Sequence, residues 1–179
     1  MRVIAGRFGG RGLVAPRGAS TRPTSDRVRE ALFSILGPVS ADRGSVLDLF
    51  AGSGALGIEA LSRGASRATF VDSSSAAVAA IRRNLAALGV EAEVRRQDAL
   101  SYLRGAPRDA RQYDLVFLDP PYRHASALGQ ELSAALGPVL APAARVVTES
   151  DRRAPLELDL EPLDERRYGD TLIRIYGPR

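Results

Sequence analysis

The sequence contains no cysteine and a single histidine, His124. Without cysteine the chain forms no disulfide and no thiolate metal site, and one imidazole is too few for a histidine metal cluster. We therefore expect chemistry that needs no metal. The first residues lack the apolar centre of a signal peptide, and no apolar run approaches the roughly 20 residues that span a membrane. These absences predict a cytoplasmic protein that does not associate with membranes.

Lysine is absent too: all 25 residues counted as lysine or arginine are arginine. A genome rich in G and C, which favours Arg and Ala codons, accounts for that absence. The position of the charge is more informative: the first 25 residues hold five arginines and no acid, whereas the other 154 hold 20 arginines and 21 acids. The five are Arg2, Arg7, Arg11, Arg17 and Arg22. Because arginine binds phosphate bidentately and stacks on bases, this segment indicates a polyanionic partner.

The chain has 179 residues, 45% of them apolar, which suits one main domain with a small appendage. Two short β-prone runs flank the Gly9-Gly10 pair and predict a β-hairpin with basic side chains near its tip. We expect residues 1–21 to form this basic arm and residues 22–179 to form the main domain. The main domain begins with an amphipathic helix that Thr24 or Ser25 caps and that Gly37-Pro38 ends.

From residue 45 onward, strands and helices alternate. The pattern predicts strands at 45–50, 67–72, 92–98, 113–119 and 144–150, with helices at 55–64, 74–89, 99–104 and 126–136 between them. This alternation is typical of an α/β fold with a parallel, doubly wound sheet. The last segment, 160–177, instead predicts two strands that turn near Gly169-Asp170, so we expect the sheet to close with an antiparallel hairpin.

A glycine-rich loop follows the first predicted strand. In a doubly wound sheet, ligands bind beyond the carboxyl ends of the strands. Gly52, Gly54 and Gly57 lie there, and the loop amides with the helix N-terminus behind them favour an anion. The glycine pattern alone also fits a dinucleotide site, so a nicotinamide-dependent oxidoreductase is one alternative.

Three acidic residues distinguish a dinucleotide site from a site for S-adenosylmethionine. A carboxylate at Asp48 would repel a pyrophosphate but attract the ammonium and sulfonium groups of S-adenosylmethionine. We expect Asp48 to bind the amino group of this cofactor, Asp72 its ribose hydroxyls and Asp98 its adenine amine. Each acid taken singly is as consistent with a helix cap or a turn. The predicted cofactor residues of this region are Asp48, Gly52, Ser53, Gly54, Asp72, Ser73, Asp98 and Ala99.

The fourth predicted strand ends in the sequence Asp119-Pro120-Pro121-Tyr122. An exocyclic amine on a planar ring is a poor nucleophile because its lone pair is delocalised. If the Asp119 carboxylate and the Pro120 carbonyl accept the two amine hydrogens, the lone pair points at the methyl donor, and Tyr122 stacks on the flat substrate. We predict that these four residues are catalytic, through positioning and electrostatics. A proline turn with a structural tyrosine is the alternative.

With these motifs in order, the chain resembles the RsmD family of bacterial 16S rRNA (guanine-N2)-methyltransferases, a branch of the Rossmann-like, class I S-adenosylmethionine-dependent enzymes. The resemblance covers "MRVIAGRFGGRGLVAPRG", "TRPTSDRVREALFSIL", "VLDLFAGSGALGIEALSRGA", "FVDSS", "DPPY" and "YGDTLIRIY". It implies that one guanosine of 16S rRNA is methylated in the 30S subunit or a late assembly intermediate.

The same resemblance assigns residues that no other pattern identifies. It implies that Arg22 and Thr24, with Pro23 between them, lie beside the cofactor over the active site. The RNA-binding residues that we expect are Arg7, Arg11, Arg17 and Arg123, and we expect a monomer. His124 we regard as a bystander.

Two further alternatives stay open. The Pro-Pro-Tyr corner suits any planar amine, so adenine N6 or a protein glutamine N5 could be the acceptor. The basic arm disfavours a protein substrate, and the lack of an inserted target-recognition domain disfavours sequence-specific DNA. A non-catalytic ribosome assembly factor is the other alternative, and the intact corner argues against it.

Overall fold

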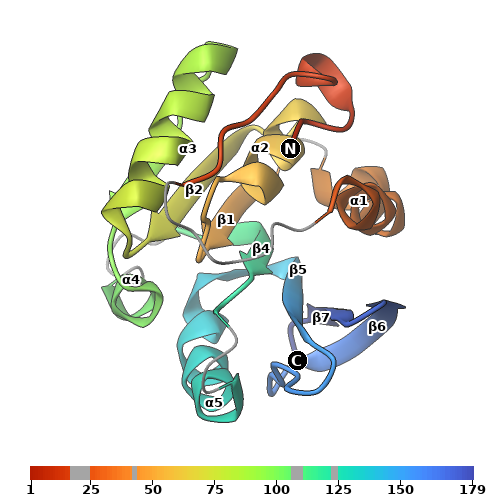
Figure 1. The fold of residues 1–179 in the computed structure, drawn as a ribbon. Coiled ribbons are helices and arrows are strands. Elements are labelled where there is room, and N and C mark those ends of the chain that lie inside the picture. The colour runs from red at the N-terminus through yellow and green to blue at the C-terminus, as the bar shows by residue number, and fades with distance from the viewer. Residues whose placement is uncertain (17–24, 42–43, 106–110, 122–124) are drawn as a thin grey trace.

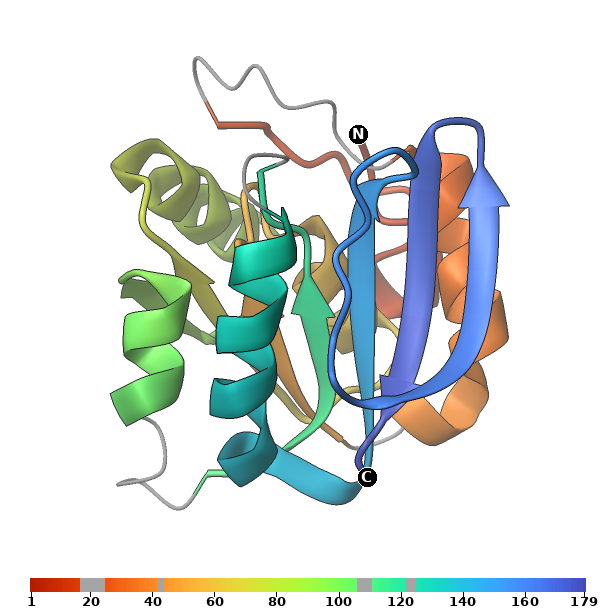
Figure 2. The same ribbon diagram turned by 90° about the horizontal axis from the view of Figure 1, so that it is seen from below.

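The computed structural model describes residues 1–16, 25–41, 44–105, 111–121 and 125–179. Its strands are β1 (Ser45–Leu49), β2 (Arg67–Asp72), β3 (Glu93–Arg96), β4 (Tyr113–Leu118), β5 (Leu140–Asp151), β6 (Glu161–Tyr168) and β7 (Thr171–Gly177). They form one sheet in the order β3-β2-β1-β4-β5-β7-β6. Neighbours among β1 to β5 are parallel, whereas β7 is antiparallel to both β5 and β6. This confirms the predicted α/β fold with a mostly parallel sheet and a closing hairpin, which Figure 2 shows at one edge.

Helices cover both faces of the sheet (Figure 1). They are α1 (Asp26–Ala41), α2 (Ala55–Ser62), α3 (Ser75–Leu88), α4 (Ala99–Gly105) and α5 (Ala125–Leu136), with the 3-10 turns η1 (Gly6–Phe8) and η3 (Gly137–Val139). Because successive side chains of a strand point to opposite faces, the central strands supply two apolar clusters. Phe117 of β4 packs with α1, α2 and α3, whereas Val116 and Leu118 pack with α4 and α5. Burial on both faces explains why these strands are apolar without alternation.

Local signals set most element boundaries. β2 has the predicted bounds, and Gly89 ends α3 in the left-handed conformation, with φ of 65°. The Ser25 hydroxyl accepts a hydrogen bond from the Val28 amide at 3.3 Å, which confirms Ser25 as the cap of α1. At Gly37 the backbone leaves the helical conformation, with φ of 59°, and a short helical piece continues to Ala41. The predicted stop at Gly37-Pro38 is therefore a kink.

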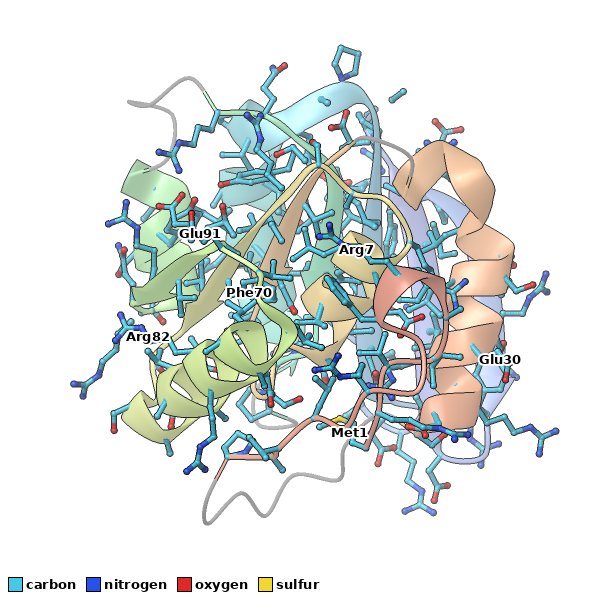
Figure 3. All side chains as sticks on the ribbon, turned by 90° about the horizontal axis from the view of Figure 1, so that it is seen from above. Met1, Arg7, Glu30, Phe70, Arg82 and Glu91 are labelled. Carbon is cyan, nitrogen blue, oxygen red and sulfur yellow. The ribbon has the colours of Figure 1, made fainter. Side chains whose placement is uncertain are left out.

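The N-terminal segment, which we define as residues 1–16, packs on α2 (Figure 3). Its hairpin pairing is a single antiparallel bridge between Arg2 and Gly12. Val3 and Leu13 are buried in the cluster that α1 and α2 share, so the segment contributes to the core. The boundary predicted between residues 21 and 22 lies outside the described residues, so the division into arm and domain stays a prediction.

The helices that the structure describes are too short or too polar to cross a membrane; none combines the length and apolar character that this requires.

Candidate active site

The carboxyl ends of the central strands bring three of the predicted acids to one edge of the sheet. β1 lies between β2 and β4, and all three run parallel. Asp48 lies in β1, Asp72 is the last residue of β2, and Asp119 directly follows β4. The structure thus brings Asp48, Asp72 and Asp119 together, as the strand order requires.

The loop between β1 and α2 needs its glycines. Gly52 and Gly54 have left-handed backbones, with φ of 55° and 76°, which other residues adopt only with strain. Phe50, with φ of 59°, is strained in this way. Gly57 has a different role: a Cβ atom there would collide with the Phe70 ring, so α2 can lie this close to β2 only without a side chain.

Asp48 is a buried carboxyl group that shapes the loop. Its Oδ2 accepts a hydrogen bond from the Gly57 amide at 2.9 Å. Burial, together with the charge of the nearby Asp72, raises the pKa of Asp48 to about 8, although the Gly57 hydrogen bond acts to lower it. No arginine among the described residues forms an ion pair with Asp48. An ammonium group of a ligand would fit this position, because it would supply the missing opposite charge.

Asp72 and Asp98 both bond to backbone amides. Asp72 accepts from the amides of Gly52 at 2.9 Å and Ser74 at 2.8 Å. Asp98 accepts from the Ser101 amide at 2.9 Å at the start of α4. These are the turn and cap bonds that the sequence allowed as alternatives. Since a carboxylate has about four acceptor sites, both acids keep capacity for a ligand hydroxyl or amine.

The smaller predicted cofactor residues differ in exposure. Ser73 is exposed and Ser53 is partly buried. The methyl group of Ala99 is buried in the core beneath the sheet, so only the backbone of this residue is a candidate for ligand contact.

The predicted catalytic corner is acidic and partly enclosed. Asp119 is half-buried, Pro120 is buried and Pro121 is exposed, whereas Tyr122 lies outside the described residues. Burial raises the pKa of Asp119 well above its usual value, and the carboxyl groups of Glu149 and Asp48 raise it further. Three carboxyl groups therefore share this corner. Such a site attracts cations and the hydrogens of an amine.

Several buried polar side chains were not predicted from the sequence, and the four with a charged or amide group bear on the site. They are Arg29, Glu59, Asn84 and Glu149. One signal could have found three of them: each interrupts the apolar face of a predicted helix. The fourth, Glu149, stands at the end of a predicted strand, as the other acids do.

Arg29 and Glu59 hold the N-terminal segment in place. The Arg29 guanidinium donates to the Arg2 carbonyl and to Asp26, each at 2.6 Å. Burial lowers its pKa, and the charges of Asp26, Glu59 and Glu149 oppose that effect. Glu59 accepts hydrogen bonds from the amides of Ile4 at 2.7 Å and Ala5 at 3.1 Å.

Two of the predicted RNA-binding arginines are described, and both are exposed. The Arg7 guanidinium lies over the Phe8 ring, 4.4 Å from its centroid. Arg11 donates to the Ala87 carbonyl of α3 at 2.8 Å. The predicted residues outside the described parts of the chain are Arg17, Arg22, Pro23, Thr24, Tyr122, Arg123 and His124.

The described parts of the chain contain no group of three histidine, cysteine, aspartate or glutamate side chains placed to hold a metal ion.

Comparisons with known proteins show which proteins this chain is similar to. The family described as "Conserved hypothetical protein 95" matches residues 1–177. The chain is 41% identical over 189 residues to "Putative rRNA methyltransferase YlbH" of Bacillus subtilis, and the match covers 100% of both chains. It is 38% identical over 185 residues to "Ribosomal RNA small subunit methyltransferase D" of Haemophilus influenzae, covering 98% of this chain and 93% of the other.

Solved structures show the same similarity. "Putative methyltransferase yhhF from Escherichia coli" superposes with a TM-score of 0.83 at 36% identity, covering 100% of this chain and 98% of the other. A more distant structure, "SMU.776, a putative methyltransferase complexed with SAH", shares the fold with a TM-score of 0.67 at 19% identity, covering 84% and 48%.

Proposed function

Because the chain belongs to the RsmD family of ribosomal RNA methyltransferases, we propose that it transfers a methyl group from S-adenosyl-L-methionine to the exocyclic N2 amine of one guanosine in 16S rRNA. One observation carries this proposal beyond the family. Asp119 and Pro120 directly follow β4, which lies beside β1, and Asp48 is buried in β1 next to the glycine loop. An amine acceptor and a cationic methyl donor therefore have adjacent sites.

The residues at the edge of the sheet fit the cofactor. The loop amides at the start of α2 suit its carboxylate, and buried Asp48 suits its ammonium group. Asp72 and Asp98 have acceptor capacity for the ribose hydroxyls and the adenine amine. We also assign Arg22 and Thr24 to this site, from the family resemblance. When bound, the cofactor supplies a methyl group activated by its sulfonium.

The catalytic corner orients the amine. Asp119 and the Pro120 carbonyl accept the two N2 hydrogens, so the lone pair faces the methyl group, and Tyr122 stacks on the guanine. With the cofactor bound, transfer would form the N–C bond as the S–C bond breaks, would release S-adenosylhomocysteine, and would pass one amine proton to solvent. Asp119 stabilises the positive charge on nitrogen during transfer. This requires its carboxylate form, which the cationic cofactor favours by offsetting the charges of Asp48 and Glu149.

The substrate is the 30S subunit or a late assembly intermediate in the cytoplasm, bound by a monomer. The exposed guanidinium groups of Arg7 and Arg11 support this proposal, because they lie on the segment that flanks the glycine loop. Arg17 and Arg123 complete the proposed RNA-binding set. No other function has a specific observation in its favour.

The test is methyl transfer from labelled S-adenosylmethionine to 30S subunits from a strain that lacks this protein. Wild-type subunits and free 16S RNA serve as controls, and nuclease digestion with mass spectrometry maps the product. We expect N2-methylguanosine at one position, and only in subunits from the deletion strain. Methyladenosine in place of methylguanosine would contradict the assignment, as would transfer to protein.

A further inference from the structure

Asn84 of α3 connects two parts of the molecule that lie far apart in the sequence. Its side chain is 2% exposed. The amide nitrogen donates to the Ser53 carbonyl in the glycine loop at 2.9 Å and to the Val14 carbonyl at 3.0 Å. The amide oxygen accepts from the Val14 amide at 2.8 Å. One buried side chain therefore forms hydrogen bonds with both the glycine loop and the N-terminal segment.

On the loop side, Asn84 fixes one peptide group. The Ser53 carbonyl and the Gly54 amide belong to the same planar unit. Asn84 holds the carbonyl end, and the Gly54 amide donates to the Ala51 carbonyl at 2.6 Å. With both ends bonded, this peptide cannot rotate. Its orientation sets the direction of the amides that follow at the start of α2, where no described side chain caps the helix.

On the other side, the N-terminal segment is fastened at several points. Glu59 and Arg29 hold its first residues, and Asn84 holds Val14. Its start also touches the loop, since the Ser53 hydroxyl lies 3.6 Å from the Met1 sulfur (Figure 3 shows Met1). If the segment left this position, the buried Asn84 amide would lose two of its three hydrogen bonds, which is costly. Docking of the segment and the geometry of the loop therefore stabilise each other.

We propose that Asn84 is a positioning residue of the cofactor site and that the N-terminal segment is part of that site, because Asn84 fastens the Ser53 peptide to Val14. The segment then has a role in cofactor affinity that is independent of its contact with RNA. This inference rests on the proposed function, since it assumes that the glycine loop holds S-adenosylmethionine.

The test compares Asn84→Ala with two neighbours on α3. Leu85→Ala opens a cavity in the core and lowers the melting temperature without removing a side-chain hydrogen bond, and Arg83→Ala changes an exposed residue. Calorimetric titration with S-adenosylhomocysteine measures affinity. We expect Asn84→Ala to weaken binding roughly tenfold, about the worth of one lost hydrogen bond, while both neighbours stay within about twofold.

Two further readouts identify the cause. In the Asn84→Ala protein, the Val14 amide should exchange hydrogen faster than in the wild type. In methyl-transfer assays, KM for S-adenosylmethionine should rise while KM for the 30S subunit stays unchanged. Asn84→Asp keeps an acceptor for the Val14 amide but loses both donated bonds, so it should bind S-adenosylhomocysteine as weakly as Asn84→Ala.

The outcomes separate this inference from the proposed function. Wild-type affinity in Asn84→Ala, or an equal loss in Leu85→Ala, would overturn the role of Asn84 and leave the proposed function standing. A wild-type protein that binds no S-adenosylhomocysteine would instead overturn the proposed function itself.

Discussion

Asp119 and Asp48 are carboxyl groups whose surroundings oppose their charge. Burial acts on both; Asp119 also lies near the carboxyl groups of Glu149 and Asp48, and Asp48 near that of Asp72. A folded protein that keeps such groups sacrifices stability, and sites of this kind concentrate where ligands or substrates bind. Replacing either residue should therefore impair catalysis or ligand binding without destabilising the folded protein.

Asp119→Ala should lower kcat by roughly 10²- to 10³-fold, because the amine loses an acceptor that matters most in the transition state. The variant should remain folded, since the lost carboxyl group is destabilised by its surroundings. Single-turnover methyl transfer and calorimetry with S-adenosylhomocysteine check this, and cofactor affinity should stay within about twofold. Asp170→Asn, in the exposed turn between β6 and β7, is the control. Unimpaired transfer by Asp119→Ala would disprove the proposed role.

Asp48→Asn should stabilise the protein without cofactor at neutral pH. The folded state raises the pKa of Asp48 to about 8, so it binds this proton more tightly than the unfolded state does. The contribution of Asp48 to the free energy of unfolding is therefore fully present below pH about 4 and is lost as the pH rises toward 8. At pH 7 the variant should gain roughly 2–4 kcal/mol in urea denaturation, and near pH 4 it should match the wild type.

The same variant should bind S-adenosylhomocysteine more weakly, because the ligand ammonium favours the carboxylate form of Asp48 and asparagine cannot ionise to pair with it. Asp159→Asn, at an exposed site, is the control and should change neither quantity. A stability difference that is equal at pH 4 and pH 7 would contradict the linkage to Asp48.

At the scale of elements, the packing of α2 on β2 depends on Gly57. A Cβ atom there would collide with the Phe70 ring and lie 3.1 Å from the Asp48 carboxylate. Gly57→Ala should therefore destabilise the fold by roughly 1–3 kcal/mol in thermal or urea denaturation. Gly105→Ala is the control, because an added Cβ atom there meets no described residue within 4 Å other than its chain neighbours and its own helix backbone. If the collision is the cause, Phe70→Leu should recover part of the loss.

Local patterns predicted the elements well. Short stretches of sequence are enough to predict the alternation of strands and helices, because each element has its own hydrophobic period. Caps such as Ser25 and Gly89 likewise act on the helix that they adjoin. The acids at the strand ends followed from the strand order, since parallel strands bring their carboxyl ends to one edge. These parts of the fold and of the candidate site could be predicted from the sequence.

Contacts between distant residues could not be predicted. Asn84 and Val14 are 70 positions apart, and Ile4 and Glu59 are 55 apart, so no local pattern links them. The hairpin signal at the double glycine was present, but the burial of Val3 and Leu13 depends on α2. The sequence shows that the N-terminal segment is basic. Its role in the core appears only in the folded structure, where it meets α2 and Asn84.

At the scale of the whole molecule, the charge is arranged by segment. Arg7 and Arg11 are exposed but partly fixed, by the Phe8 ring and the Ala87 carbonyl. Fixed side chains lose less entropy when they meet phosphate.

Arg7→Ala and Arg11→Ala should therefore each weaken binding to the 30S subunit. Each should also lower the slope of log affinity against log salt by roughly 0.7–0.9, the value for one phosphate contact. Filter binding at several salt concentrations measures this, with Arg166→Ala on the edge strand β6 as the control. An unchanged slope would show that these arginines are solvated surface residues that do not contact phosphate.

The contact between Met1 and Ser53 has a practical consequence for work with this protein. Any residues fused ahead of Met1 emerge beside the glycine loop, whereas the C-terminus lies at the far end of the sheet (Figure 2). An affinity tag at the amino end would thus crowd the proposed cofactor site, and purification handles or fluorophores belong at the carboxyl end.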